Sequence, residues 1–371
     1  MRKGPHPLSV HIGMAASEMA RDSAKTGAAG DISYQENFAK MLRGIQRYQC
    51  SPAQVSTPPL KTIWQEGEVR LMTLPDQAVA TPVVFLPSLV NKANILNLIE
   101  GRSMMQYFAS QGLAPLLIDW GQSAQDPGQA NFESLIQDRI VSILDFVADM
   151  YGQKPHAMGY CMGGTILAAV AALAGDKLAS ATFLAAPWDF HAGGGALQKR
   201  VAFWYPSAMQ ALESKRVLDQ DWLQTVFASL DPLLTRNKFI KFADMEEGTP
   251  DHDIFIAIED WLNDGVDLPY EIAQTCIQRW FFDNETAQNK WHVGGKVIQP
   301  AHINVPCLVV ASKQDRLVEY ASAHALTASL KNVREVSPQC GHVGMIAGRH
   351  AIKTAWQPMV EFIAYCNNKN P

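Results

Sequence analysis

The sequence contains few charged residues and no concentration of them. Asp, Glu, Lys and Arg together make up 18% of its 371 residues, and the formal net charge is -5 at pH 7. The basic residues are scattered, without a run of Lys and Arg. Because nucleic acids and anionic membranes are bound largely through basic patches, neither is expected as a general partner. The 47% of apolar residues is typical of a globular chain with a buried core.

Long apolar runs are also missing. No stretch approaches the roughly 20 apolar residues that a membrane-spanning helix needs, so no transmembrane segment is predicted. The N-terminus starts with basic residues but has no apolar segment of signal-peptide length. We therefore expect a cytoplasmic protein whose contacts with a lipid or polymer surface are peripheral.

The cysteines lack the spacing of metal or redox sites. All six are far apart and no C-x-x-C pair occurs, which excludes the usual zinc-ribbon and thioredoxin patterns. A chain of this length does not need disulfides, so reduced thiols are expected. The triplet Asp251-His252-Asp253 has the composition of a metal site, but such a triplet on a loop is more often a solvated face. Neither a metal nor a cofactor is predicted.

From residue 82 onward, short apolar runs alternate with helical stretches. The apolar runs predict strands at residues 83–86, 115–118, 156–158, 181–185, 307–310 and 333–336. The stretches between and after them predict helices at residues 103–111, 133–151, 161–174, 321–330 and 353–365. Continuous apolar strands separated by helices predict a mostly parallel, doubly wound sheet that is covered on both faces.

The alternation is interrupted once. It stops near residue 187, gives way to a helical segment rich in Trp, and resumes near residue 299. We therefore predict an α/β core formed by residues 76–187 and 299–371, with residues 188–298 inserted as a helical cap.

The residues before the core are predicted to be a partly helical lead-in, at residues 1–75. Residues 36–48 have helical spacing, and residues 51–60 are rich in Pro, Ser and Thr, as in a connector. For residues 1–63 a flexible surface tail is the favoured interpretation.

The hexapeptide Gly159-Tyr160-Cys161-Met162-Gly163-Gly164 lies between a predicted strand and an Ala-rich helix. It has the G-x-S-x-G pattern of a nucleophile elbow, with Cys in the position of Ser. Side chains at the first and fifth positions would collide with the neighbouring strand and helix. The pattern therefore predicts an α/β-hydrolase fold with Cys161 as the nucleophile, and the alternative is a structural turn with a buried, inert Cys.

An acid and a base follow in the chain order that this fold requires. Asp315 comes after the predicted strand at residues 307–310, and His342 after the one at residues 333–336. The carboxyl ends of parallel strands meet at one edge of a sheet, so the three residues predict a Cys161–His342–Asp315 triad.

The same fold predicts where an oxyanion would be stabilised. One backbone N–H comes from the residue after the nucleophile, here Met162, and another from the loop after an early strand. That loop follows the strand at residues 83–86, which makes Leu89 and Val90 the candidates.

Taken together, these stretches resemble the polyhydroxyalkanoate synthases, the Cys-dependent acyltransferases that polymerise 3-hydroxyacyl-CoA. The elbow is similar to that family's G-x-C-x-G-G box, which dienelactone hydrolases nearly share. Three other stretches are similar to synthase segments: residues 91–98 to N-[KR]-x-x-I-L-[DN]-L, residues 117–121 to its D-W-G stretch, and residues 260–269 to W-N-x-D-x-x-x-L-P. The resemblance runs from about Trp64 to the end of the chain.

The resemblance implies a polyester-forming acyltransferase with a covalent acyl group on Cys161. Coenzyme A would enter as part of the substrate, so no separate cofactor is implied. The short members of the family work with a second subunit, and the resemblance also implies a homodimer and the polymer granule surface as partners.

Two alternatives stay open. After its acid the family tends to show D-H-[IL]-x-P, whereas this chain has Asp315-Arg316-Leu317-Val318-Glu319. A Cys-dependent hydrolase (an esterase, thioesterase or dienelactone-hydrolase-like enzyme) would use the same triad, and a catalytically idle relative would keep the fold alone. Polymerase and hydrolase differ in whether the cap keeps water from the acyl-enzyme.

Overall fold

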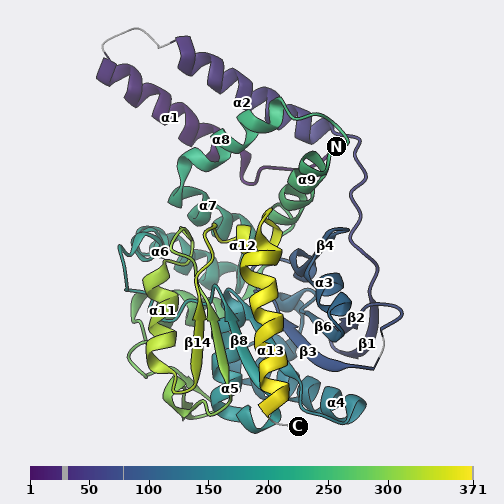
Figure 1. The fold of residues 1–371 in the computed structure, drawn as a ribbon. Helices are drawn as coiled ribbons and strands as arrows, with labels where there is room; N and C mark the ends of the chain where they lie inside the picture. Colours follow the sequence, from purple (N-terminus) through teal and green to yellow (C-terminus); the bar gives the residue numbers. More distant parts are fainter. Residues whose placement is uncertain (27–31, 78, 370–371) are drawn as a thin grey trace.

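The computed structural model describes residues 1–26, 32–77 and 79–369. At its centre lies an eight-stranded sheet of order β1-β2-β6-β3-β7-β8-β13-β14 (Figure 1). β2 is antiparallel to β1 and β6, and the strands from β6 to β14 are parallel to one another. In chain order the strands are Lys61–Glu66, Val69–Thr73, Thr81–Leu86, Leu113–Asp119, His156–Tyr160, Ser180–Leu184, Cys307–Val310 and Val333–Val336. The mostly parallel sheet that the sequence predicts is confirmed.

Helices cover both faces of this sheet. One face carries α4 (Val141–Tyr151), α5 (Met162–Ala174) and α11 (Tyr320–Ser329), and the other carries α3 (Met104–Ser110) and α13 (Gln357–Lys369). Along β3, Val84 joins the first apolar core, whereas Val83 and Phe85 join the second. A strand buried on both faces must be apolar at successive positions, which is why the inner strands appear in the sequence as unbroken apolar runs.

The sheet begins earlier in the chain than predicted. β1 and β2 form an antiparallel hairpin, so the sheet starts at Lys61 rather than after residue 75. β1 is mostly exposed, and β2 alternates between buried and half-buried side chains. A hairpin at the edge of a sheet keeps one face near water and gives no continuous apolar run.

The segment between β8 and β13 is mainly helical. Its helices are α6 (Ala196–Lys215), α7 (Gln220–Leu230), α8 (Pro232–Ala243), α9 (Pro250–Leu262) and α10 (Tyr270–Gln274), which continues into a π-helix at Thr275–Phe282. In this segment every strand is only two residues long. The helices lie beyond the end of the sheet where β3, β7, β8 and β13 have their carboxyl ends (Figure 1).

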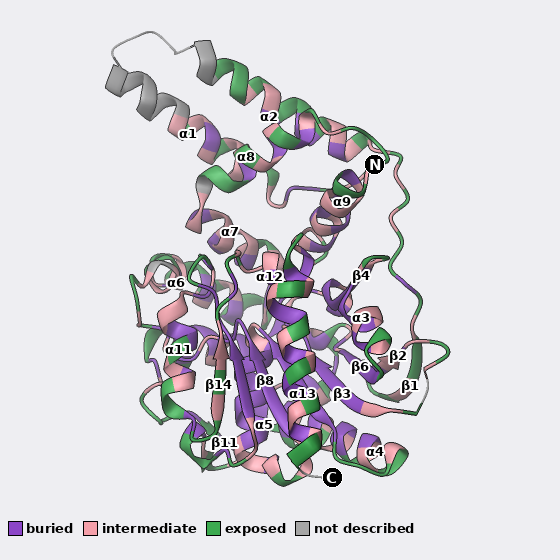
Figure 2. Cartoon of the chain, in the orientation of Figure 1, coloured by how far each residue is buried: buried purple, intermediate pink, exposed green. Residues whose placement is uncertain are grey.

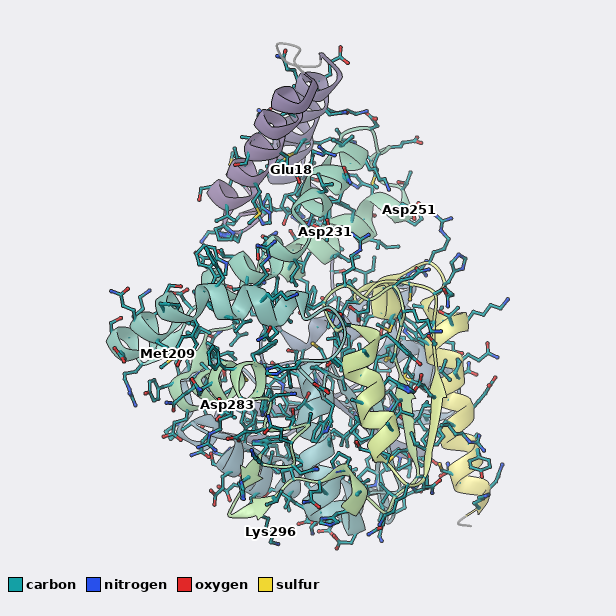
Figure 3. The ribbon with its side chains drawn as sticks, turned by 90° about the vertical axis from the view of Figure 1, so that its left-hand side faces the viewer. Glu18, Met209, Asp231, Asp251, Asp283 and Lys296 are labelled. Carbon is teal, nitrogen blue, oxygen red and sulfur yellow. The ribbon has the colours of Figure 1, made fainter. Side chains whose placement is uncertain are left out.

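The N-terminal residues form a helical hairpin that packs on the cap. α1 (Leu8–Thr26) and α2 (Ile32–Cys50) lie against α8 and α9, with buried residues facing these helices (Figures 1 and 2). The shared apolar cluster consists of Ala15, Met41, Ile45, Tyr48, Phe239, Phe242 and Ile256. Figure 3 shows the hairpin, marked by Glu18, at one end of the molecule and Asp231 and Asp251 of the cap below it.

The interpretation of residues 1–63 as a flexible surface tail is therefore wrong for the described part of that segment. The helical spacing of residues 36–48 and the connector at residues 51–60 are confirmed. The apolar face of α2 finds its partner in α8, far away in the sequence, and spacing alone cannot identify such a partner. Within the described ranges, no helix is long and apolar enough to cross a membrane.

Candidate active site

Cys161 lies on the tight turn between β7 and α5. Its backbone adopts φ 56° and ψ -124°, where residues other than glycine are rarely found. The turn is held by Cys161 N–H, which donates to Leu184 O at 2.9 Å, and by Gly164 N–H, which donates to Cys161 O at 2.8 Å. Strained residues of this kind persist only where the surroundings fix them, and they cluster at functional sites.

Two glycines allow this turn to pack as closely as it does. A Cβ atom at Gly159 would lie 2.6 Å from Gly164 Cα, and one at Gly163 would lie 2.6 Å from Pro87 O. Both distances are far below van der Waals contact, and both neighbours are backbone atoms that cannot swing aside. The prediction that side chains at these two positions would collide with the neighbouring elements is confirmed.

Asp315 and His342 form a buried hydrogen-bonded pair. His342 Nδ1 lies 2.7 Å from Asp315 Oδ2, and their side chains are only 9% and 1% exposed. The other carboxylate oxygen, Oδ1, accepts the backbone N–H groups of Leu317 at 2.8 Å and Val318 at 2.9 Å. An ionised carboxylate can only accept hydrogen bonds, so Nδ1 of the His342 ring must carry the hydrogen. Nε2 then stays available to a second partner.

The charges around His342 favour its protonated form. Burial of the ring lowers its pKa, but the charges of Asp315 and of a Cys161 thiolate, with hydrogen bonds to both side chains, raise that pKa to about 10. The ring therefore lies within electrostatic reach of Cys161. An imidazolium beside a cysteine stabilises the thiolate, which is the nucleophilic form of that residue. The structure thus brings the three predicted triad residues together.

Tyr160 is a further residue of this site, which sequence reasoning missed. Its ring stacks on that of His342, with centroids 5.1 Å apart and an angle of 29° between the planes. The side chain is 2% exposed, and its hydroxyl has no hydrogen-bond partner in the described part of the chain. Its position directly before the nucleophile was the only available signal.

The loop after β3 and the start of α5 supply the backbone N–H groups expected to form an oxyanion hole. Met162 is the first residue of α5, where a backbone N–H has no partner within the helix. Val90 N–H donates to Ser88 Oγ at 3.3 Å, whereas no acceptor for Leu89 N–H is found in the described ranges. Of the two loop residues predicted, Leu89 is thus the one with an unused N–H.

Arg316 stands where the resembled family tends to have His, and it contacts the cap. Its guanidinium Nη1 lies 2.5 Å from Asp231 Oδ2, at the start of α8. The Arg316 side chain is 79% exposed, so the pair is largely solvated. This departure from the family pattern leaves the Asp315–His342 contact intact.

The triplet Asp251-His252-Asp253 does not lie on a loop. It forms the first turn of α9, where acidic side chains favourably face the positive end of the helix dipole. His252 is buried, against the expectation of a solvated face, and its ring stacks on Phe242. Among the described residues, no group of three or more His, Cys, Asp or Glu side chains is arranged to hold a metal ion.

Comparisons with known proteins give the chain a family. The model of the alpha/beta hydrolase fold family matches residues 81–348. The chain is 24% identical to the poly(3-hydroxyalkanoate) polymerase subunit PhaC of Haloferax mediterranei over 85% of its own length and 65% of the relative. It is 25% identical to the PhaC of a Synechocystis species, over 85% of this chain and 86% of that one. The resemblance to polyhydroxyalkanoate synthases is confirmed, although the chain spans just under two thirds of the Haloferax protein.

Solved structures agree on the fold. A thermostable carboxyl esterase from Bacillus coagulans superposes with a TM-score of 0.54 at 13% identity, covering 84% of this chain and 98% of the esterase. A membrane phospholipase A, a bacterial virulence factor, superposes with a TM-score of 0.51 at 13% identity, covering 97% of this chain and 96% of the phospholipase. Together with the family match, these findings show that the chain belongs to the α/β-hydrolase fold family.

Proposed function

We propose that this protein is an acyltransferase that polymerises 3-hydroxyacyl-CoA into polyhydroxyalkanoate through an acyl-enzyme on Cys161. The observation that carries the proposal is the buried His342–Asp315 pair, 2.7 Å apart, beside a cysteine on a nucleophile elbow. The similarity to polymerase subunits over most of the chain supports the choice of substrate.

The first step transfers the acyl group to the enzyme. His342 Nε2 accepts the proton of Cys161, and the sulfur attacks the thioester carbonyl carbon of the substrate. The carbonyl oxygen becomes an oxyanion, which the N–H groups of Leu89 and Met162 stabilise. The bond to the CoA sulfur then breaks, and His342 returns the proton to that sulfur. Asp315 keeps the imidazole in the required tautomer throughout.

The second step extends the polyester. His342 takes the proton from the hydroxyl group of another 3-hydroxyacyl unit, and the hydroxyl oxygen attacks the acyl group on Cys161. An ester forms, and the cysteine sulfur leaves with the proton from His342. Cysteine suits this sequence because exchange between two thioesters is nearly isoenergetic, so the acyl-enzyme stays activated for transfer to an alcohol. A second subunit, a second copy of the chain and the granule surface are the partners that this activity implies.

The test uses the full chain and its Cys161→Ala variant with 3-hydroxybutyryl-CoA. Thiol release and the acyl product are followed together. Release with insoluble polyester, abolished in Cys161→Ala, supports the proposal, and release with free hydroxy acid alone indicates a hydrolase. Cys340→Ala is the matched control, since Cys340 is the other half-buried thiol and has no role in the mechanism.

A further inference from the structure

The three stretches that resemble synthase segments meet at one loop. This oxyanion loop, residues 87–92, joins β3 to the 3-10 helix at Ala93–Leu96. Asn91 opens the first stretch, Trp120 lies in the D-W-G stretch, and Trp261 lies in the stretch that ends α9. Asn91, Trp120 and Trp261 are far apart in the sequence, which gave no reason to expect them at the same loop.

A tryptophan of the core holds the beginning of the loop. Trp120 Nε1 donates to Pro87 O at 3.1 Å. The Trp120 side chain is 3% exposed, and Gln129 Nε2 donates to its backbone oxygen at 2.8 Å. The first carbonyl of the loop is therefore bound to a side chain that is itself fixed.

A tryptophan of the cap holds the end of the loop. Trp261 Nε1 donates to Lys92 O at 2.8 Å, and Val266 N–H donates to Val90 O at 3.0 Å. Asn91 pairs with Gly265 in an antiparallel bridge, and its Nδ2 donates to Trp261 O at 3.4 Å. The last turn of α9 and the residues that follow it thus bind three successive residues of the loop.

Leu89 lies between these two attachments. Its N–H has no acceptor in the part of the chain that the structure describes, while the carbonyls of Pro87, Val90 and Lys92 each receive a donor. An oxyanion donor is effective only when it is held at about 2.7–3.1 Å from the developing charge before the reaction. A loop without regular secondary structure must obtain that rigidity from outside.

We propose that Trp120 and Trp261 are positioning residues that clamp the oxyanion loop from the core and from the cap, so that Leu89 N–H is fixed for catalysis. The inference rests on the proposed function only in taking this loop as the oxyanion hole. On this inference the cap, through Trp261, is a structural part of the catalytic site.

The test separates reactions that need an oxyanion from one that does not. Trp261→Phe and Trp120→Phe each keep an aromatic ring and remove a single N–H donor. Acylation of Cys161 by p-nitrophenyl butyrate and by 3-hydroxybutyryl-CoA passes through an oxyanion, whereas alkylation by iodoacetamide does not. We expect the acylation rate to fall about tenfold or more in each variant, with the alkylation rate unchanged.

Trp280→Phe is the matched control. Trp280 is a buried cap tryptophan whose Nε1 has no hydrogen-bond partner among the described residues, so both rates should stay as in the parent. Unchanged acylation in both loop variants, or an equal fall of acylation and alkylation, would overturn the inference. A parent that is acylated but makes no polymer would overturn the proposed function and leave the clamp standing.

Discussion

The nucleophile elbow and the oxyanion loop lie next to each other, yet they are held by different kinds of contact. The elbow is shaped by close steric contacts, since Gly159 packs on Gly164 and Gly163 packs on the loop backbone at Pro87. The loop depends on partners that are distant in sequence, namely Trp120 and Trp261. One half of the site is therefore determined by steric packing of the backbone and the other by side-chain hydrogen bonds from distant residues.

This difference predicts that substitutions in the two regions have different effects on stability and activity. A change in the elbow should harm folding and chemistry together, because the same atoms serve both. A change in a loop anchor should harm the chemistry more than the fold, because the loop can relax into another conformation.

The largest effect is expected for Gly163→Ala. The added methyl group would lie 2.6 Å from Pro87 O, and relief requires moving β3 away from α5. We expect a loss of about 3 kcal/mol in the free energy of unfolding and loss of acylation, measured by urea denaturation and thiol release. Gly175→Ala is the control, because nothing lies within 4 Å of its Cβ position. Equal stability of the two variants would contradict a sterically fixed elbow.

Asp315→Asn tests a side chain that is fixed locally but acts on a distant residue. The amide can still accept the N–H groups of Leu317 and Val318, so the fold should survive. Its NH₂ group would face His342 Nδ1 and force the ring into the wrong tautomer, with an expected fall in kcat of about 10³-fold or more. Thermal unfolding and single-turnover acylation would measure the two effects separately.

The pH dependence gives a second view of the same pair. Burial lowers the His342 pKa, but Asp315 and Cys161 raise it to about 10, so the imidazolium exists below that pH and is lost above it. That value belongs to the free enzyme, because an acylated Cys161 carries no thiolate charge. An NMR titration of the free protein should therefore show the His342 imidazolium through neutral pH and its decline as pH rises toward 10. In Asp315→Asn, where the raising charge is gone, the decline should move to lower pH. A decline at the same pH in the parent and in Asp315→Asn would contradict the assignment of Asp315 as the group that raises the His342 pKa.

Asp260→Ala tests whether contacts between the N-terminal hairpin and α9 contribute to holding the oxyanion loop. Asp260 precedes Trp261 and accepts from Arg2 Nε at 2.9 Å and from Tyr48 Oη at 2.8 Å, which ties the N-terminal hairpin to α9. We expect about 1 kcal/mol of destabilisation, seen as faster proteolysis at residues 51–60. Acylation should fall less than in Trp261→Phe. Unchanged cleavage would mean that the apolar cluster alone holds the hairpin.

The smallest effect is expected for Lys92→Met. Lys92 Nζ pairs with Asp264 Oδ2 at 2.6 Å, but the two side chains are 41% and 57% exposed. Exposed ion pairs contribute about 0–1 kcal/mol, so stability and acylation should both stay close to the parent values. A large loss of acylation would show that this charge pair, rather than the indole N–H of Trp261, holds the end of the loop.

Much of the core could be predicted because each of its features has a local signal. The predicted bounds of β13 and β14, residues 307–310 and 333–336, agree with the structure. β13 is an inner strand that is buried along its length, whereas β14 lies at the edge of the sheet and is only partly buried. The meeting of Asp315 with His342 was predictable from chain order, since parallel strands end at one edge of the sheet.

The rest depended on contacts that have no local signal. The β1–β2 hairpin is half solvated, and the docking of α2 on α8 joins segments that are far apart in the chain. Trp120 and Trp261 stood out only as parts of resembling stretches, because a hydrogen bond to a loop carbonyl leaves no periodicity. Tyr160 lies within the elbow motif, whose pattern specifies the nucleophile and the glycines but leaves this position open.

The bridge between Asn91 and Gly265 has a consequence for protein engineering. Cap insertions are attractive units to exchange between relatives, because they enter and leave the core at two points only. Here a transplanted cap would arrive with its own residues at the positions of Trp261 and Val266, and these would have to suit the recipient's loop. A chimaera that ignores this match would fold with an intact nucleophile and acylate slowly. Changing the loop and the segment after α9 together is the route to a working hybrid.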